Sequence, residues 1–412
     1  MWNNALFTQD SEKILGDKVE FIELGHEQVG YYDGAHSIAS AARPYRKMPT
    51  TTWLSFIWAY GSSVWKAAGL AQDGTNLREA MLKAAPAADV RAILQALGVL
   101  QPAQQWAGAT VAERGISARY AAEILDPQVR RAHGQQGLQD TTGLAAMLAA
   151  AQEDGANAYA AAGGDNMLER LQRVVRKTGA GVRTARRVVG LRHQQFDKEH
   201  AAWLVRHEPT HNNGRRGGQD ASVEAFDKVI LAAFDLEIQP ESSDGRTYNL
   251  TAMYEPDMNA GSVSKGDDRA FSSVHVTFFT SDAKLSPWGG NDQALFLDAG
   301  NVEGMQEVAL VREIISLHDG SLKTEYLYRV LSQSPVIQEL HKYANITWSY
   351  HTKIENAYPI LVPQSTFPLF KAPFVEGLWW TTLIQHAGST VDLNWLAGKA
   401  VAEDLIKGVT QK

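Results

Sequence analysis

The stretch EAFDKVILAAFDLEI, Glu224 to Ile238, sets an apolar run, Val229 to Phe234, between a charged lead-in and an acidic tail. A short apolar run with polar flanks is typical of a strand buried on both faces, as at the centre of a doubly wound sheet. In such sheets a glycine-rich loop presents backbone N–H groups to a nucleotide. The stretch therefore predicts an α/β layer. It also raises the question of where a nucleotide-binding loop would lie.

Composition excludes several classes of protein. The chain has 412 residues, so we expect two intertwined or consecutive domains. Its net charge of -7 argues against a nucleic-acid partner, because phosphate binding requires clustered positive charge. The chain has no cysteine, which excludes disulfides, thiolate catalysis and cysteine metal sites.

The sequence given contains no recognisable signal peptide or transmembrane segment. The N-terminal stretch MWNNALFTQDSEKIL has no basic segment followed by an apolar one, and no apolar run is long enough for a transmembrane segment. We therefore expect a soluble protein, cytoplasmic rather than secreted. The pattern does not specify the oligomeric state.

The periodicity changes along the chain and suggests five segments. Apolar residues at helical spacing predict a helical subdomain, and strict alternation further on predicts a mostly antiparallel sheet. The predicted segments are residues 1–49 (strands and linker), 50–158 (helical), 159–240 (strands around the opening stretch), 241–374 (antiparallel sheet) and 375–412 (a return strand and the C-terminal helix).

The stretch HEPTH, His207 to His211, matches a zinc-binding pattern letter for letter. That chemistry requires both histidines on one face of a continuous helix, and Pro209 interrupts a helix here. We therefore predict a hairpin tip and no metal site. The basic residues between Val174 and Arg192 lack interleaved aromatics and predict a solvated surface.

The stretch GLWWTTLIQHAGSTVDLNW, residues 377–395, predicts a strand, a turn of small residues and a helix. The N-terminus of a helix that follows a strand is a common ligand site, because free N–H groups point there. His386, Asp392 and Gln385 are therefore the candidate catalytic groups. The alternative is that Thr390 or Asp392 only caps the helix.

Aromatic residues crowd the C-terminal third of the chain. Most are expected in the core, and a lipophilic cavity is the alternative interpretation. The candidate substrate-binding residues are Trp379, Trp380, Tyr350 and Trp395.

Several stretches occur in an order that resembles the prenylcysteine oxidase (prenylcysteine lyase) family: VGYYDG, AGGDNMLERL, FDKVILAAF, SSVHVTFFTSDAKLSP and LWWTTLI. The resemblance extends over roughly residues 25–410. It implies an FAD-dependent enzyme that oxidises the thioether of prenylated cysteine and releases an isoprenoid aldehyde and hydrogen peroxide. It also implies a fold of class α+β or α/β, with a Rossmann-like FAD-type domain, an antiparallel substrate domain and a helical subdomain. The implied cofactor contacts are Gly163, Gly164, Val182 and Leu383.

The chain departs from this family at two places. It lacks the GxGxxG loop, so the Rossmann-like domain would be incomplete, and Leu383 stands where the family has a glycine that admits the flavin. These departures argue against FAD and leave three interpretations open. The chain is a flavoenzyme for a lipophilic isoprenoid or polyketide-like molecule, a flavin-free enzyme for an isomerisation, cyclisation or pericyclic reaction, or a lipophilic-ligand binding protein.

Overall fold

The computed structural model describes most of the chain. The described residues are 5–19, 21–23, 28–34, 36–42, 48–134, 137–154, 157–161, 167–197, 200–210, 221–233, 240–242, 244–248, 271–285, 293–297, 304–318, 321–367, 369–372 and 375–410.

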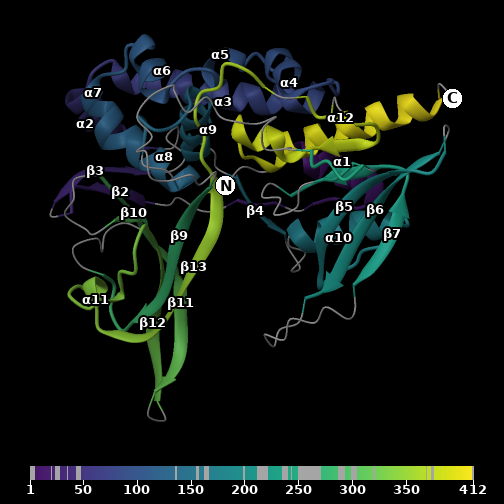
Figure 1. Cartoon of the computed structure of the whole chain (residues 1–412). Helices are drawn as coiled ribbons and strands as arrows, with labels where there is room; N and C mark the ends of the chain where they lie inside the picture. Colours follow the sequence, from purple (N-terminus) through teal and green to yellow (C-terminus); the bar gives the residue numbers. More distant parts are fainter. Residues whose placement is uncertain are drawn as a thin grey trace.

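A seven-stranded sheet dominates the lower part of the molecule in Figure 1, in the order β13-β9-β12-β11-β10-β2-β3. All neighbours are antiparallel except β10 and β2. The strands are β13 (Ile346–Pro359), β9 (Phe271–Ser281), β12 (Ser321–Ser332), β11 (Met305–His318), β10 (Gln293–Phe296), β2 (Gln28–Tyr32) and β3 (Ser37–Ala42). The predicted antiparallel sheet is therefore confirmed, and two strands from the first 49 residues complete it.

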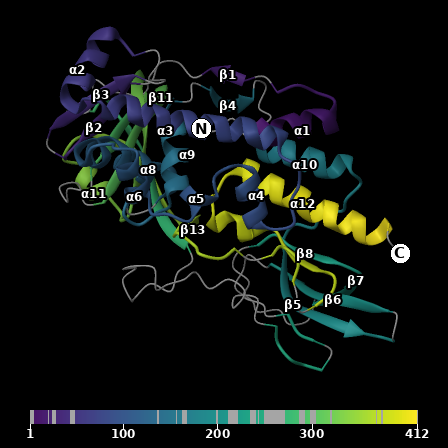
Figure 2. The same cartoon turned by 90° about the horizontal axis from the view of Figure 1, so that it is seen from above.

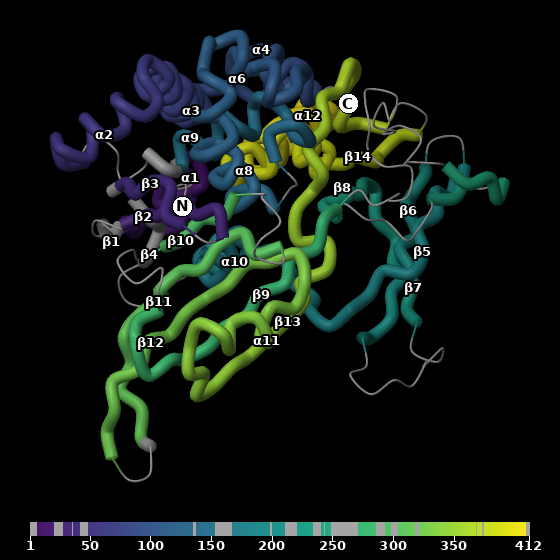
Figure 3. The backbone as a smooth tube through the Cα atoms, turned by 90° about the vertical axis from the view of Figure 1, so that its left-hand side faces the viewer, coloured from purple at the N-terminus to yellow at the C-terminus, as the bar shows by residue number. Residues whose placement is uncertain are grey.

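One face of this sheet has its own core. Phe279 on β9 stacks on Tyr328 of β12 with ring centroids 5.4 Å apart. Helix α11 (Ile337–Leu340) lies beside them and buries Leu340 in the same cluster. The β11–β12 hairpin continues beyond this core and projects away from the helices in Figure 3.

A layer of helices between Thr50 and Asp154 lies above the seven-stranded sheet in Figure 1 and is seen from above in Figure 2. The longest pair, α3 and α9, packs closely because Gly74 has no side chain. A Cβ there would lie 2.5 Å from that of Ala151. The layer contains α2 (Thr50–Tyr60), α3 (Ser63–Lys83), α4 (Val90–Ala96), α5 (Leu100–Ala103), α6 (Ala107–Glu113), α7 (Ala118–Tyr120), η2 (Ala121–Leu125), α8 (Asp126–His133) and α9 (Gly143–Asp154).

Buried charges join α8 to the sheet. Glu307 on β11 is fully buried, and its Oε2 accepts a hydrogen bond of 2.8 Å from Nη2 of Arg329. From α8, the Arg131 guanidinium lies 4.0 Å from Oε1 of Glu307, and Arg130 donates to the carbonyl of Phe296. A carboxylate removed from water requires such partners, so this cluster specifies how helices and sheet dock.

The remaining elements form a third part. Within the opening stretch, the described residues form the short strand β8 (Val229–Leu231), which pairs in parallel with β14 (Leu378–Trp380), and a separate three-stranded meander lies beside them. The expectation of a strand buried at the centre of a larger sheet is wrong for these residues, because the pair has two strands and Ile230 is 46% exposed. Helices α1, α10 and α12 pack here (Figure 2). The other elements are β5 (Arg186–Gln195), β6 (Ala201–Pro209), β7 (Ser222–Phe226), the pair β1 (Phe21–Glu23) and β4 (Asn157–Ala161), α1 (Ala5–Leu15), α10 (Met167–Lys177), η5 (Thr382–His386) and α12 (Val391–Thr410).

The fold is α+β, and several sequence expectations are corrected in this third part. The predicted return strand ends at Trp380, and residues 382–386 form a 3₁₀ turn instead. Helix α1 and strand β7 were missed. His207, Glu208 and Pro209, which were expected at a hairpin tip, lie in strand β6, and His211 lies outside the described residues. In the part of the chain that the structure describes, no group of three potential ligands could hold a metal.

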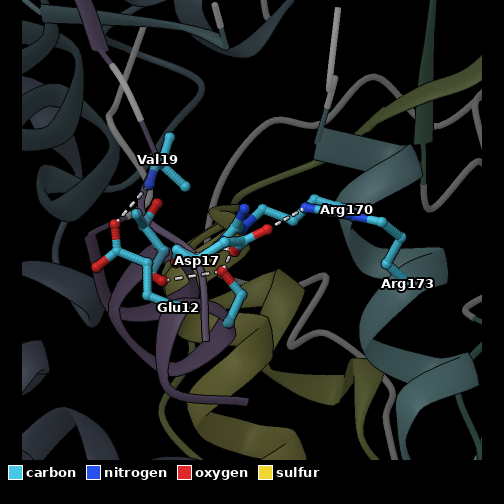
Figure 4. Close-up of polar contacts among 7 residues, drawn as sticks. Glu12, Asp17, Val19, Arg170 and Arg173 are labelled. Carbon is cyan, nitrogen blue, oxygen red and sulfur yellow. Dashed lines mark hydrogen bonds and ion pairs between the residues drawn. The ribbon is translucent and has the colours of Figure 1, made fainter. Parts of the chain in front are cut away.

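An arginine clamp holds α1 to α10 (Figure 4). Arg170, 2% exposed, donates from Nε to Ser11 Oγ at 2.6 Å and from Nη2 to Asp17 Oδ1 at 2.8 Å. Arg173 bonds the second Asp17 oxygen at 2.8 Å. Burial raises the pKa of Asp17, but the two arginines outweigh it and the pKa lies below its ordinary value. The clamp therefore positions the helices beside the β8–β14 pair.

None of the described helices combines the length and the apolar character needed to cross a membrane.

Candidate functional site

The two tryptophans of β14 are structural anchors. Trp379 and Trp380 are 4% and 5% exposed. The indole N–H of Trp379 donates to Asp404 of α12 at 2.9 Å, and that of Trp380 donates to the carbonyl of Ala233 at 2.9 Å. A buried indole needs such a partner for its N–H group, and these partners lie within the protein. The substrate contact predicted for both residues stays a prediction.

In the turn after β14, polar side chains form hydrogen bonds with other residues of the same segment. Gln385 donates from Nε2 to Oδ1 of Asn394 at 3.2 Å. The hydroxyl of Thr390 accepts a hydrogen bond of 3.2 Å from the backbone N–H of Leu393, as an N-cap does. Thr390 therefore caps α12, as the alternative from the sequence anticipated.

His386 lies inside this turn and is 2% exposed. Its burial lowers the pKa of the imidazole to about 2, so the ring is neutral across the physiological range. A neutral imidazole can orient a neighbour. It holds no proton to donate as an imidazolium near pH 7.

Asp392 and Trp395 face helix α1. Asp392 is 1% exposed, and its Oδ1 accepts a hydrogen bond of 3.1 Å from the backbone N–H of Phe7, in the first turn of α1. Trp395 packs edge-on against the Phe7 ring and donates to Asp10 at 2.9 Å. The structure thus brings the candidates His386, Asp392, Gln385 and Trp395 into one segment and attaches that segment to α1.

The fit of a flavin can be tested at Leu383. This side chain is 1% exposed and belongs to the main core cluster. The backbone N–H groups of Leu393 and Asn394, in the first turn of α12, are bonded to Thr390. The Leu383 side chain is thus packed in the core, its contact with a flavin stays a prediction, and we derive no reaction step through FAD here.

The other predicted cofactor contacts lie elsewhere. Val182 precedes β5 and is 55% exposed. Gly163 and Gly164 lie outside the described residues. The four cofactor contacts therefore stay predictions.

Tyr350 occupies a different surface, on the edge strand β13. It lies opposite Phe278 of β9, and alternate residues along β13 share its face of the sheet. Trp348, Tyr350 and Ile354 are 52%, 54% and 46% exposed. We call these three residues the apolar stripe. Together with Thr352, which lies between Tyr350 and Ile354 on this face, they form a mostly apolar surface on an edge strand.

Of these three residues, only Tyr350 was among the substrate-binding candidates named from the sequence. Trp348 and Ile354 were not. The signal was present in ITWSYHTKI, residues 346–354, where large apolar residues alternate with polar ones. Alternation predicts a strand with one apolar face, but it does not say whether that face is covered. At Asn356 the backbone has a φ of 51° and the pairing register shifts, which ends the stripe.

The fold is α+β, and the described part of it carries an exposed apolar stripe on an edge strand. The model of the prenylcysteine lyase family matches residues 47–412, so the chain belongs to that family. No curated protein matches it.

This membership confirms the resemblance seen in the sequence and makes the chain prenylcysteine-oxidase-like. The family is FAD-dependent. Membership of the family therefore does not support the expectation that FAD is absent. The missing GxGxxG loop is no evidence either way, because nothing can be concluded from the residue at which the sequence begins.

Proposed function

We propose that this chain is an oxidoreductase that binds a lipophilic small molecule, an isoprenoid thioether in the first instance, on the apolar stripe. The observation that carries the proposal is the exposure of Trp348, Tyr350 and Ile354 on one face of β13. Membership of the prenylcysteine lyase family supports the substrate class and the oxidative chemistry.

The stripe suits an elongated apolar chain. Side chains two residues apart on a strand are spaced by about 6.6 Å, so the three residues extend along roughly 20 Å of one face. Covering aromatic and aliphatic surface contributes about 25 cal/mol per Å², without any directional contact. The neighbouring face-mate Phe278 extends the surface across to β9.

The proposed cofactor is FAD, which supplies the oxidising capacity when bound. In this proposal the Rossmann-like part, residues 159–240 and 375–412, holds it. Its contacts come from the segment around Gly163 and Gly164 rather than from the packed turn at Leu383. The β8–β14 pair and helix α10 belong to that part, and α1 packs against α10.

The first test is spectroscopic. Purified protein is titrated with FAD and followed by flavin absorbance and fluorescence. Saturable binding is expected. A protein that remains colourless and does not perturb the flavin would overturn the cofactor assignment.

The second test addresses the stripe. S-farnesylcysteine is supplied to the FAD-loaded protein and hydrogen peroxide is measured. The double variant Trp348→Ala/Tyr350→Ala should raise KM by about tenfold or more, since two aromatic contacts are lost. Phe226→Ala is the matched control, because Phe226 is an aromatic residue 43% exposed on β7, outside the stripe. Equal kinetics for the double variant and wild type would overturn the stripe as the substrate surface.

A further inference from the structure

A small apolar pocket lies within the helical layer, away from the apolar stripe. Its volume is about 190 Å³, and it opens between α2 and α3. Its lining comprises Met48, Trp53, Phe56, Val64, Ala67, Ala68, Ala71, Gln72, Tyr120, Leu125, Gln128 and Ala150. We call it the α2–α3 pocket.

The pocket exists because α3 presents small residues to it. Ala67 and Ala68 lie three and four residues after Val64, and Ala71 lies four and three residues after them, so all four share one helix face. Larger side chains at these positions would fill the space. Ala71 is buried at the floor, whereas Ala68 and Gln72 are exposed at the mouth.

A π-turn arranges the opposite wall. The N–H of Asp126 bonds to the carbonyl of Ala121, five residues back, within η2. In a regular α-helix, residues five apart point about 140° away from each other, and the wider π-turn brings them towards one face. It therefore places Tyr120 and Leu125 together in the pocket wall, and Gln128 follows one turn later.

The hydroxyl of Tyr120 is the chemical feature of this wall. The residue is 4% exposed, and no residue that the structure describes forms a hydrogen bond with its hydroxyl. Its neighbour Tyr60 differs, since that hydroxyl donates to Glu123 Oε2 at 2.8 Å. Burial, then the nearby Tyr31 and Tyr60, raise the pKa of Tyr120, so its hydroxyl stays protonated at neutral pH and can donate.

We propose that the α2–α3 pocket binds a small apolar molecule carrying one acceptor oxygen, such as a ketone, aldehyde or ether, which accepts a hydrogen bond from Tyr120. An acceptor oxygen on the ligand would give this hydroxyl a hydrogen-bond partner inside an apolar pocket. An apolar cavity of about 150 Å³ takes up benzene, so this one suits a molecule of roughly nine non-hydrogen atoms. The site is additional to the stripe and does not depend on the proposed reaction.

Two isosteric probes separate the hydrogen bond from the apolar contact. Acetophenone has a carbonyl oxygen, and cumene has a methyl group in the same place. Binding of each to the full chain is measured by ligand-observed NMR. Tyr120→Phe should weaken acetophenone binding about tenfold and change cumene binding less than about twofold. Equal effects on both probes would overturn the role of the hydroxyl.

A filling variant tests the location. Ala71→Leu should reduce the affinity for both probes at least about tenfold, because the added methyl groups occupy the floor of the pocket. Ala112→Leu is the matched control on an exposed position of α6, and should bind both probes as wild type does. Circular dichroism checks that each variant is folded. Failure of wild type to bind either probe, or unchanged binding by a folded Ala71→Leu, would overturn the site.

Discussion

Two strands of this protein carry aromatic pairs in opposite circumstances. On β14, Trp379 and Trp380 are almost fully buried, and each indole N–H bonds within the protein. On β13, Trp348 and Tyr350 are more than half exposed. The residue types are the same, so chemistry alone does not distinguish an anchor from a binding surface. The difference lies in what packs on each strand, since α12 provides the Asp404 partner of β14 whereas β13 is a sheet edge.

The strongest test of this contrast is stability. Trp380→Ala should lower the free energy of unfolding by about 3–5 kcal/mol, because it leaves a large cavity and removes one of the two donors to the carbonyl of Ala233, the other being the hydroxyl of Thr382. Tyr350→Ala should lower it by less than about 1 kcal/mol, since the side chain is exposed. Urea denaturation followed by fluorescence measures both. Similar losses for the two variants would remove the distinction between the strands.

The pH dependence of stability tests whether the turn after β14 is structural. Folding lowers the pKa of His386 from 6.5 to about 2, so below pH 6.5 the unfolded chain binds a proton that the native chain does not. Stability is therefore unaffected above pH 6.5 and falls as the pH drops towards 2, approaching about 1.4 kcal/mol per pH unit.

His386→Gln should remove this contribution from the slope between pH 6 and 4.5, where carboxylates with lowered pKa values do not yet titrate. His133, whose pKa is lowered to about 4, contributes equally to both proteins and cancels in the comparison. Equal slopes for variant and wild type would show that His386 titrates normally, as a catalytic acid or base would.

The smallest expected effect concerns Asp392. Asp392→Ala should cost about 1–2 kcal/mol, because the N–H of Phe7 loses its acceptor and α1 loses a cap. Asp392→Asn keeps an acceptor oxygen and should lose less than half as much. Thermal unfolding of both variants measures the difference. A larger loss for asparagine than for alanine would contradict the capping role.

The comparison also shows where prediction from sequence succeeded. The long alternating stretches that became β9, β11, β12 and β13 were predicted as an antiparallel sheet, because a period of two appears directly in the residues. The helices from Thr50 onward were predicted from a different period, apolar residues three and four positions apart. The stretch from Thr382 to His386 was predicted as strand but forms a 3₁₀ turn, since its apolar residues enter the core without pairing.

For the candidate site, the sequence showed which residue types were present but not which side chains are buried and which are exposed. Tyr350 was identified among many aromatics, whereas Trp348 and Ile354 emerged only from the register of β13 on β9. Tyr120 was not noticed, because its place in a pocket depends on a π-turn and on alanines some fifty residues earlier. No local sequence pattern predicts contact between residues this far apart.

The sequence by itself determined the periodicity of the elements, the absence of thiol chemistry and, through the order of its stretches, the family. Each of these properties depends on residue types or on residues that are close together in the sequence. The tertiary structure alone decided that Asp392 caps α1, that His386 is kept neutral, and that one aromatic pair is buried while the other stays open. Burial and partnership depend on residues hundreds of positions apart, and only folding brings them into contact.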